Sequence, residues 1–149
     1  MRRYQIISEV LVMLLSGMFL YTAISKLLDF EKTRLALENQ VFPLWMAEGL
    51  LYGLPIFEFG AVVLLLIPKF RYIGFWFSLV LMTSFTGYIL AVMMGVFDRV
   101  PCSCGGVIDS LSWGEHLVFN VVFWGFAGVG VMLSGDRCRM SGVASAPSR

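Results

Sequence analysis

Charged residues are scarce in this sequence: they make up 14% of its 149 residues, whereas hydrophobic residues make up 58%. A soluble domain of this length needs a larger polar surface, so the composition excludes the soluble class. The sequence also lacks a glycine-rich phosphate loop, a basic patch for nucleic acid and a hydrolase triad. These absences argue against nucleotide chemistry, nucleic-acid binding and hydrolysis.

The hydrophobic residues gather in four runs near the length of roughly 20 residues that a bilayer demands. Backbone groups in lipid must be satisfied within each segment, so each run is predicted to be a helix. We therefore predict an all-α integral membrane protein, a four-transmembrane-helix bundle formed by a single domain over residues 1–134. A flexible tail is expected over residues 135–149. The predicted spans are about 6–28, 47–67, 72–96 and 116–134.

Lysine and arginine predict the orientation, because they are richer on the cytoplasmic side of membrane proteins. Only four of the eleven fall on the other side: Lys26, at the outer end of the first span, and Lys32, Arg34 and Arg99 in the first and third connections. The other seven lie at the N-terminus, between the second and third spans, and in the tail: Arg2, Arg3, Lys69, Arg71, Arg137, Arg139 and Arg149. Both termini are predicted to be cytoplasmic, which places the segment with Cys102 and Cys104 outside, in the periplasm of a bacterial cell.

The two longer connections carry signals of their own. Residues 29–46 read as a short amphipathic surface helix over Phe30, Leu35 and Leu37. The cysteine segment closes with the residues of a capping box, Ser112 to Glu115, which would satisfy the free amides that begin the fourth span. Small residues in the spans predict faces where helix backbones approach closely: Gly49, Gly53, Thr83, Gly87, Ala91, Gly125 and Gly128.

Glu58 and Lys26 are ionisable residues that lie within the predicted spans. Glu58 follows Pro55 near the middle of the second span. A structural hydrogen-bonding role and a proton-handling role are both open for its carboxyl group, because ionisable groups in lipid usually face the bundle interior. Lys26 lies near the outer end of the first span, and counting about 1.5 Å per residue places Glu58 about 10 Å deeper. Lys26 can reach inward toward Glu58 or outward, and because of this difference in depth we expect it to extend toward the headgroups or Glu48 as an anchor.

His116 is the single histidine and opens the fourth span, on the same side as the cysteines. Asn120 follows one helical turn later, so the two side chains share a face and are predicted to present donor and acceptor groups to one ligand. A histidine there can accept a proton from a thiol or donate to a quinone carbonyl. The alternative is an interfacial residue bonded to a loop carbonyl.

Cys102 and Cys104 are separated by one residue, between Pro101 and a glycine pair. A disulfide at this spacing closes a very small ring, because the usual Cα separation of about 5.5 Å is difficult to reach with relaxed dihedrals. Such a bond should be strained and relatively oxidising, which suits thiol–disulfide exchange. Soft-metal binding to copper or zinc and an inert structural role remain alternatives. The third cysteine, Cys138, is expected to be a free cytoplasmic thiol.

Three stretches resemble the DoxX-like membrane proteins, and within them the MauE branch associated with methylamine utilisation. They are GMFLYTAISKLL at 17–28, LPIFEFGAVVLLL at 54–66, and PCSCGGVIDSLSWGEHLVFN at 101–120. The last is the most specific, because it carries a Cys-x-Cys loop, a glycine and a polar helix opening. The resemblance covers about residues 4 to 134.

The resemblance implies an inner-membrane protein that supports disulfide formation in a periplasmic partner, and relatives in the DoxX group look linked to the quinone pool. The predicted mechanism is a thiol:disulfide oxidoreductase with Cys102 and Cys104 as the redox pair and His116 assisting proton transfer. The predicted quinone site is formed by His116, Asn120 and Glu58. The alternatives are a non-catalytic scaffold subunit of a larger membrane complex and a soft-metal binding or transport protein.

Overall fold

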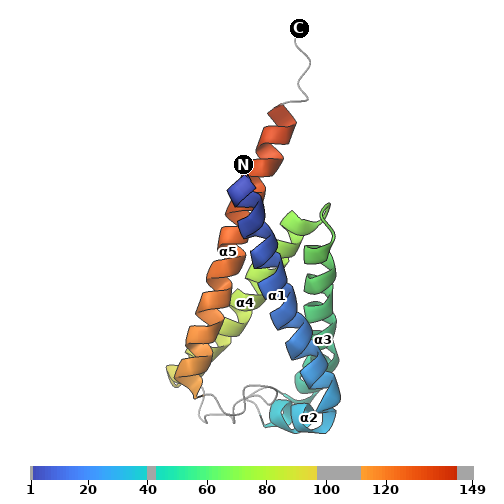
Figure 1. Ribbon diagram of the computed structural model, residues 1–149. Helices are drawn as coiled ribbons and strands as arrows, with labels where there is room; N and C mark the ends of the chain where they lie inside the picture. Colours follow the sequence, from blue (N-terminus) through green and yellow to red (C-terminus); the bar gives the residue numbers. More distant parts are fainter. Residues whose placement is uncertain (1, 40–42, 97–111, 144–149) are drawn as a thin grey trace.

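The computed structural model describes residues 2–39, 43–96 and 112–143, and it describes side chains from residue 3 to residue 135 of these ranges. The described residues form helices and no strands. They are α1 (Arg2–Leu28), α2 (Phe30–Glu38), α3 (Leu44–Leu66), α4 (Arg71–Met93) and α5 (Trp113–Val143) (Figure 1). The segments long and apolar enough to cross a membrane are Arg3–Leu28, Leu44–Leu66, Arg71–Met93 and Trp113–Gly135. The predicted all-α, four-span architecture is confirmed.

The four long helices form a ring in which α1 contacts α3 and α5, and α4 contacts the same two helices. The start of α1, the junction of α3 with α4 and the last residues of α5 lie at one end of the bundle (Figure 1). We call this the terminal end. The opposite end, which we call the α2 end, holds α2, the end of α4 and the start of α5. The cytoplasmic placement of the terminal end stays a prediction.

The core of the ring is apolar and built from all four long helices. Phe19, Leu65 and Phe75 are among its fully buried side chains, and Ala127 contributes from α5. Between helices that are surrounded by lipid, such packing acts through van der Waals contact and not through a difference in hydrophobicity. At the terminal end Arg71 also binds Glu9 with two bonds, of 2.6 and 3.2 Å, which join the start of α4 to α1.

Close helix approach occurs at glycines other than the predicted ones. A Cβ atom on Gly74 would lie 2.8 Å from backbone atoms of Leu64 and Leu65, and one on Gly130 would collide with the ring of Phe75. By contrast, Cβ atoms on four of the predicted glycines would meet nothing within 4 Å: Gly49, Gly87, Gly125 and Gly128. The prediction of close packing at these four is therefore wrong, because spacing on a helix does not say which face meets a neighbour.

Both connection signals are found in the structure. Helix α2 packs through Leu37 against Ala47 and Leu51 of α3, whereas Leu35, predicted on the same apolar face, is 57% exposed. The capping box is present: Glu115 Oε2 accepts from the Ser112 amide at 2.8 Å, and the Glu115 amide donates to Ser112 Oγ at 3.4 Å. Helix α5 continues past Ser134 to Val143, and so takes in the first part of the expected tail.

We expect Gly74→Ala to destabilise the bundle by about 1 to 3 kcal/mol, because the added methyl group meets backbone of α3 that cannot rotate away. Gly87→Ala on the same helix is the matched control, since open space surrounds it. Thermal unfolding of the detergent-solubilised full chain compares them. Equal unfolding temperatures for the two variants would contradict the close approach of α3 and α4 at Gly74.

Candidate functional site

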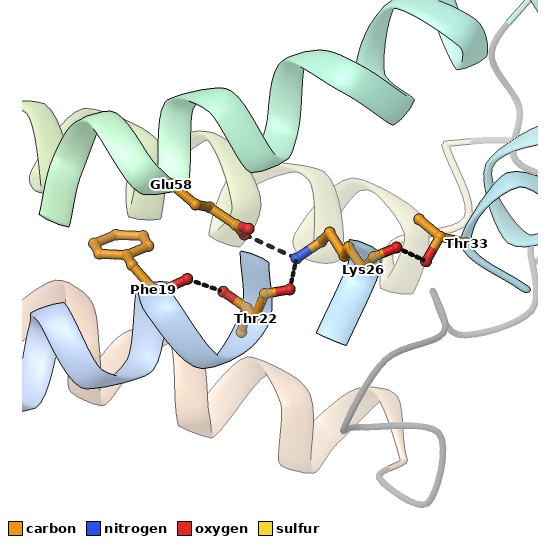
Figure 2. A network of polar contacts seen from close by, with 5 residues as sticks. All are labelled: Phe19, Thr22, Lys26, Thr33 and Glu58. Atoms are coloured by element: carbon orange, nitrogen blue, oxygen red, sulfur yellow. Dashed lines mark hydrogen bonds and ion pairs between the residues drawn. The ribbon is translucent and has the colours of Figure 1, made fainter. Parts of the chain in front are cut away.

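A buried ion pair joins the first and third helices near the α2 end. Lys26 Nζ lies 2.8 Å from Glu58 Oε1, and the exposed fractions of the two side chains are 18% and 3%. Figure 2 shows Glu58 extending from α3 toward the Lys26 ammonium group. The prediction that Lys26 would extend outward to headgroups or to Glu48, out of reach of Glu58, is therefore wrong.

The relative position of α1 and α3 explains this error. Depth counting assumed that the two helices begin and end at the same level. The first turns of α3 instead pack beside α2, where Ala47 and Leu51 contact Leu37. The last turn of α1 consequently faces a later part of α3, and the long lysine side chain spans the remaining separation.

Further polar contacts hold the lysine in place. Lys26 Nζ also donates to the carbonyl oxygen of Thr22 at 3.4 Å, and the Thr22 hydroxyl donates to the carbonyl of Phe19 at 3.1 Å. From α2, the Thr33 hydroxyl donates to the Lys26 carbonyl at 3.4 Å (Figure 2). Residues from three helices thus form one network around the ion pair.

The second carboxylate oxygen of Glu58 is not satisfied by this network. Glu58 Oε2 is buried and has no hydrogen-bond partner among the described residues. A buried ion pair offsets its desolvation cost only when the remaining lone pairs are also satisfied. Glu58 therefore keeps one acceptor that is available for a water molecule, a proton or a ligand.

His116 lies in the first turn of α5 at the α2 end and is half-buried. The Lys26 ammonium group lies within electrostatic range of its ring. Asn120 is only 4% exposed, and its Nδ2 donates to the backbone carbonyl of His116 at 3.0 Å. One of the two N–H groups of Asn120 is thus used within its own helix, and the second N–H group and the amide oxygen are left to act with His116 on a ligand.

The cysteine pair lies outside the described residues, as does the side chain of Cys138. The segment that carries Cys102 and Cys104 connects α4 to α5, and both connected helix ends lie at the α2 end (Figure 1). Lys26, Glu58 and His116 belong to the same half of the bundle. Within the described ranges, no group of three His, Cys, Asp or Glu side chains is placed to hold a metal ion.

Thr22 and Lys26 are site residues that sequence reasoning missed or misplaced. A signal for Lys26 was present, because ionisable residues inside a membrane usually pair with one another, and Lys26 and Glu58 carry opposite charges in the first two spans. For Thr22 the signal was weaker: it lies one turn before Lys26 on α1, where its carbonyl can accept from the lysine. Chemically, this arrangement can hold a proton and stabilise a charge.

A comparison with protein-family models gives one match, to a family described as "Methylamine utilisation protein MauE", over residues 4–133 of this chain. The matched region begins at the start of α1 and ends within α5. Comparison with curated proteins and with solved structures gave no match.

We expect the Lys26–Glu58 pair to behave as a coupled unit. Lys26→Met and Glu58→Leu should each destabilise the protein by about 2 to 3 kcal/mol, somewhat less than the loss of one partner of a fully buried pair, because Lys26 keeps some exposure. The double variant should lose clearly less free energy of unfolding than the sum of the losses in the two single variants, since it leaves no unpaired charge. Chemical unfolding in detergent measures all three variants.

The exposed pair Arg34–Glu38, with a bond of 2.9 Å, provides the matched control. Arg34→Met should change stability by about 0.5 kcal/mol or less, as is usual for surface pairs within one helix. Additive effects of Lys26→Met and Glu58→Leu would contradict the pairing.

Proposed function

The chain belongs to the MauE family of methylamine utilisation membrane proteins, and from that membership we propose that it supports disulfide formation in a periplasmic partner protein. The proposed redox centre is the Cys102–Cys104 pair. The observation that carries the proposal is the Cys-x-Cys spacing in the segment that connects α4 and α5, at the end of the bundle where the buried polar groups lie.

The proposed exchange is a two-electron oxidation of the partner. One partner thiolate attacks a sulfur of the Cys102–Cys104 disulfide, which forms a mixed disulfide and frees the other cysteine as a thiolate. A second partner thiolate attacks the partner's own sulfur in that mixed disulfide and releases the second cysteine. The partner loses two electrons and two protons, and the cysteine pair gains two electrons and, as it becomes a dithiol, two protons. His116, at the start of α5, is the proposed acceptor of a released proton.

The reduced pair must then be reoxidised, and we propose a membrane quinone as the acceptor of its two electrons and two protons. The residues present fit a quinone in part. His116 is half-buried and able to donate to a quinone carbonyl, whereas the free oxygen of Glu58 can accept only from a hydroxyl group of the reduced quinol. One of the two N–H groups of Asn120 is bonded to the His116 carbonyl. We therefore give Asn120 the role of orienting the first turn of α5.

The proposed location is the bacterial inner membrane, with both termini cytoplasmic and the cysteine segment periplasmic. The four apolar helices require a lipid bilayer. The distribution of lysine and arginine supports this orientation, and the α2 end then faces the periplasm. The partner is a secreted protein with thiols to be oxidised, and the chain can also act within a larger membrane complex.

We expect Cys102 and Cys104 to form a reversible couple with a midpoint of roughly −120 to −200 mV, the range of known thiol oxidants. Maleimide mass shifts of the purified protein across a glutathione redox series measure it, in a Cys138→Ser background so that every labelled thiol belongs to the pair. Cys102→Ser and Cys104→Ser are the controls, because each leaves one thiol that cannot form this disulfide.

Thiols that never pair, or a disulfide that never reduces, would overturn the exchange function. Metal analysis then separates the alternatives. Copper or zinc that copurifies in stoichiometric amount and is lost in the double serine variant would identify a soft-metal protein. A metal-free protein with an inert pair would identify a scaffold subunit.

The proposed orientation predicts different labelling of the three cysteines. In intact, mildly reduced cells, a membrane-impermeant maleimide should modify Cys102 and Cys104 and leave Cys138 unmodified, because Cys138 lies beyond the fourth span on the terminal side. Permeabilised cells provide the control in which Cys138 reacts. Labelling of Cys138 alone in intact cells would mean that the chain has the opposite orientation.

A further inference from the structure

We propose that Glu58 is a proton-exchange site inside the bundle, held in place by Lys26 and reached from the α2 end only. The inference goes beyond thiol exchange, since it concerns proton binding at a group that lies within the membrane-spanning part of α3. It deepens the proposed function only in one respect: the same site would take up a proton released at the cysteine pair.

The first support is that only one of the two carboxylate oxygens of Glu58 has a partner. Glu58 Oε1 is bound by Lys26 Nζ at 2.8 Å, whereas the buried Oε2 lacks a partner among the described residues. A pair with a purely structural role would be expected to satisfy both oxygens, because an unsatisfied buried acceptor is destabilising. The unpartnered Oε2 is the atom at which a proton can be added while Oε1 stays in contact with Lys26.

The second support is that the polar groups around Glu58 lie on its side toward the α2 end. Lys26 belongs to the last turn of α1, is partly exposed and lies beside Thr22. Thr33 of α2 donates to the Lys26 carbonyl, and His116 lies in the first turn of α5 at the same end of the bundle. The polar contacts of Glu58 therefore lead toward the α2 end, where Lys26 is partly exposed and can exchange a proton with water on behalf of the pair.

On the terminal side of Glu58 the interior of the bundle is mostly apolar. Ala61 and Leu65 on the next turns of α3 are completely buried, as are Leu15 and Phe19 of α1. These residues belong to the same apolar core cluster. The buried polar side chains on this side are neutral serines: Ser8, Ser16 and Ser78. Glu58 therefore has polar contacts toward the α2 end and a mostly apolar barrier toward the terminal end.

Among the side chains that the structure describes, few other charges act on Glu58. Lys26 faces it from α1, and α5 contributes His116 in its first turn, where Glu115 is bound to Ser112. Charged residues of α2 are at least partly exposed, and its Arg34 is paired with Glu38. In α4 the only charged residue is Arg71, at the terminal end and bound to Glu9. Lys26 is thus the dominant charge next to the site.

Infrared spectroscopy of the full-length protein in lipid nanodiscs tests the proposal, because a protonated carboxyl group has a carbonyl stretching band that the carboxylate lacks. We expect a band that disappears reversibly as the pH is raised, is missing in Glu58→Gln, and is retained in Glu48→Gln, which changes an exposed glutamate of the same helix. Lys26→Met should move this titration to higher pH, because it removes the charge that favours the carboxylate. A merely structural pair would show no titration of Glu58 in the protein with Lys26 in place.

A pH-independent Glu58 would overturn the proposal. If Glu58→Gln does not fold, Lys26→Met still tests the assignment of the band. A titration whose midpoint is unchanged in Lys26→Met cannot belong to Glu58. The same spectra of the Cys102→Ser/Cys104→Ser variant separate this site from the proposed function. If the Glu58 titration persists in this variant, the proton site is supported even if the cysteines form no redox couple. If the cysteines form a redox couple but Glu58 does not titrate, the proton site is contradicted and the proposed function is not.

Access is tested by single cysteines in a background without native cysteines. Thr22→Cys keeps the backbone carbonyl that Lys26 uses and should react with a small charged thiol reagent added on the α2 side. Ala61→Cys, on the next turn of α3 beyond Glu58, is the matched control and should stay unreactive from either side. Reaction at position 61 from the terminal side would contradict access from one end.

Discussion

Opposite charges that lie between apolar helices must meet, and the pairing of Lys26 with Glu58 is the constraint on which the arrangement of this bundle depends. Neither side chain can be left alone in a low-dielectric interior without a large cost in free energy. Their contact fixes which turn of α3 lies beside the last turn of α1. Phe19 of α1 and Leu65 of α3 belong to the same apolar core cluster, which is compatible with this alignment of the two helices.

The short helix α2 makes that alignment possible. It occupies the space beside the first turns of α3 through Leu37, and Thr33 ties it to the last turn of α1 through the Lys26 carbonyl. A direct connection between the two spans would instead place their ends side by side. Thus α2, which appears in the sequence as a surface feature, acts as a spacer that brings a lysine near the membrane surface to a deeper carboxylate.

The same arrangement links the fold to the proposed chemistry. Oxidation of thiols releases protons, and the half of the bundle to which the cysteine segment connects holds the imidazole of His116 and a carboxylate with one free oxygen. The rest of the interior is apolar, apart from buried serine hydroxyl groups such as Ser8 and Ser78. Charge is therefore concentrated where proton uptake would be useful.

Local properties of the sequence determined the membrane class, the four helices and the capping box at Ser112, since hydropathy, segment length and cap residues act within a few turns of chain. The resemblance to the MauE family was likewise readable from short motifs. Only the tertiary structure decided that Lys26 meets Glu58, that Asn120 bonds to its own helix, and that Gly74 and Gly130 are the points of close approach. The physical reason is that helix register and rotation depend on packing between segments far apart in the chain, which no local pattern encodes.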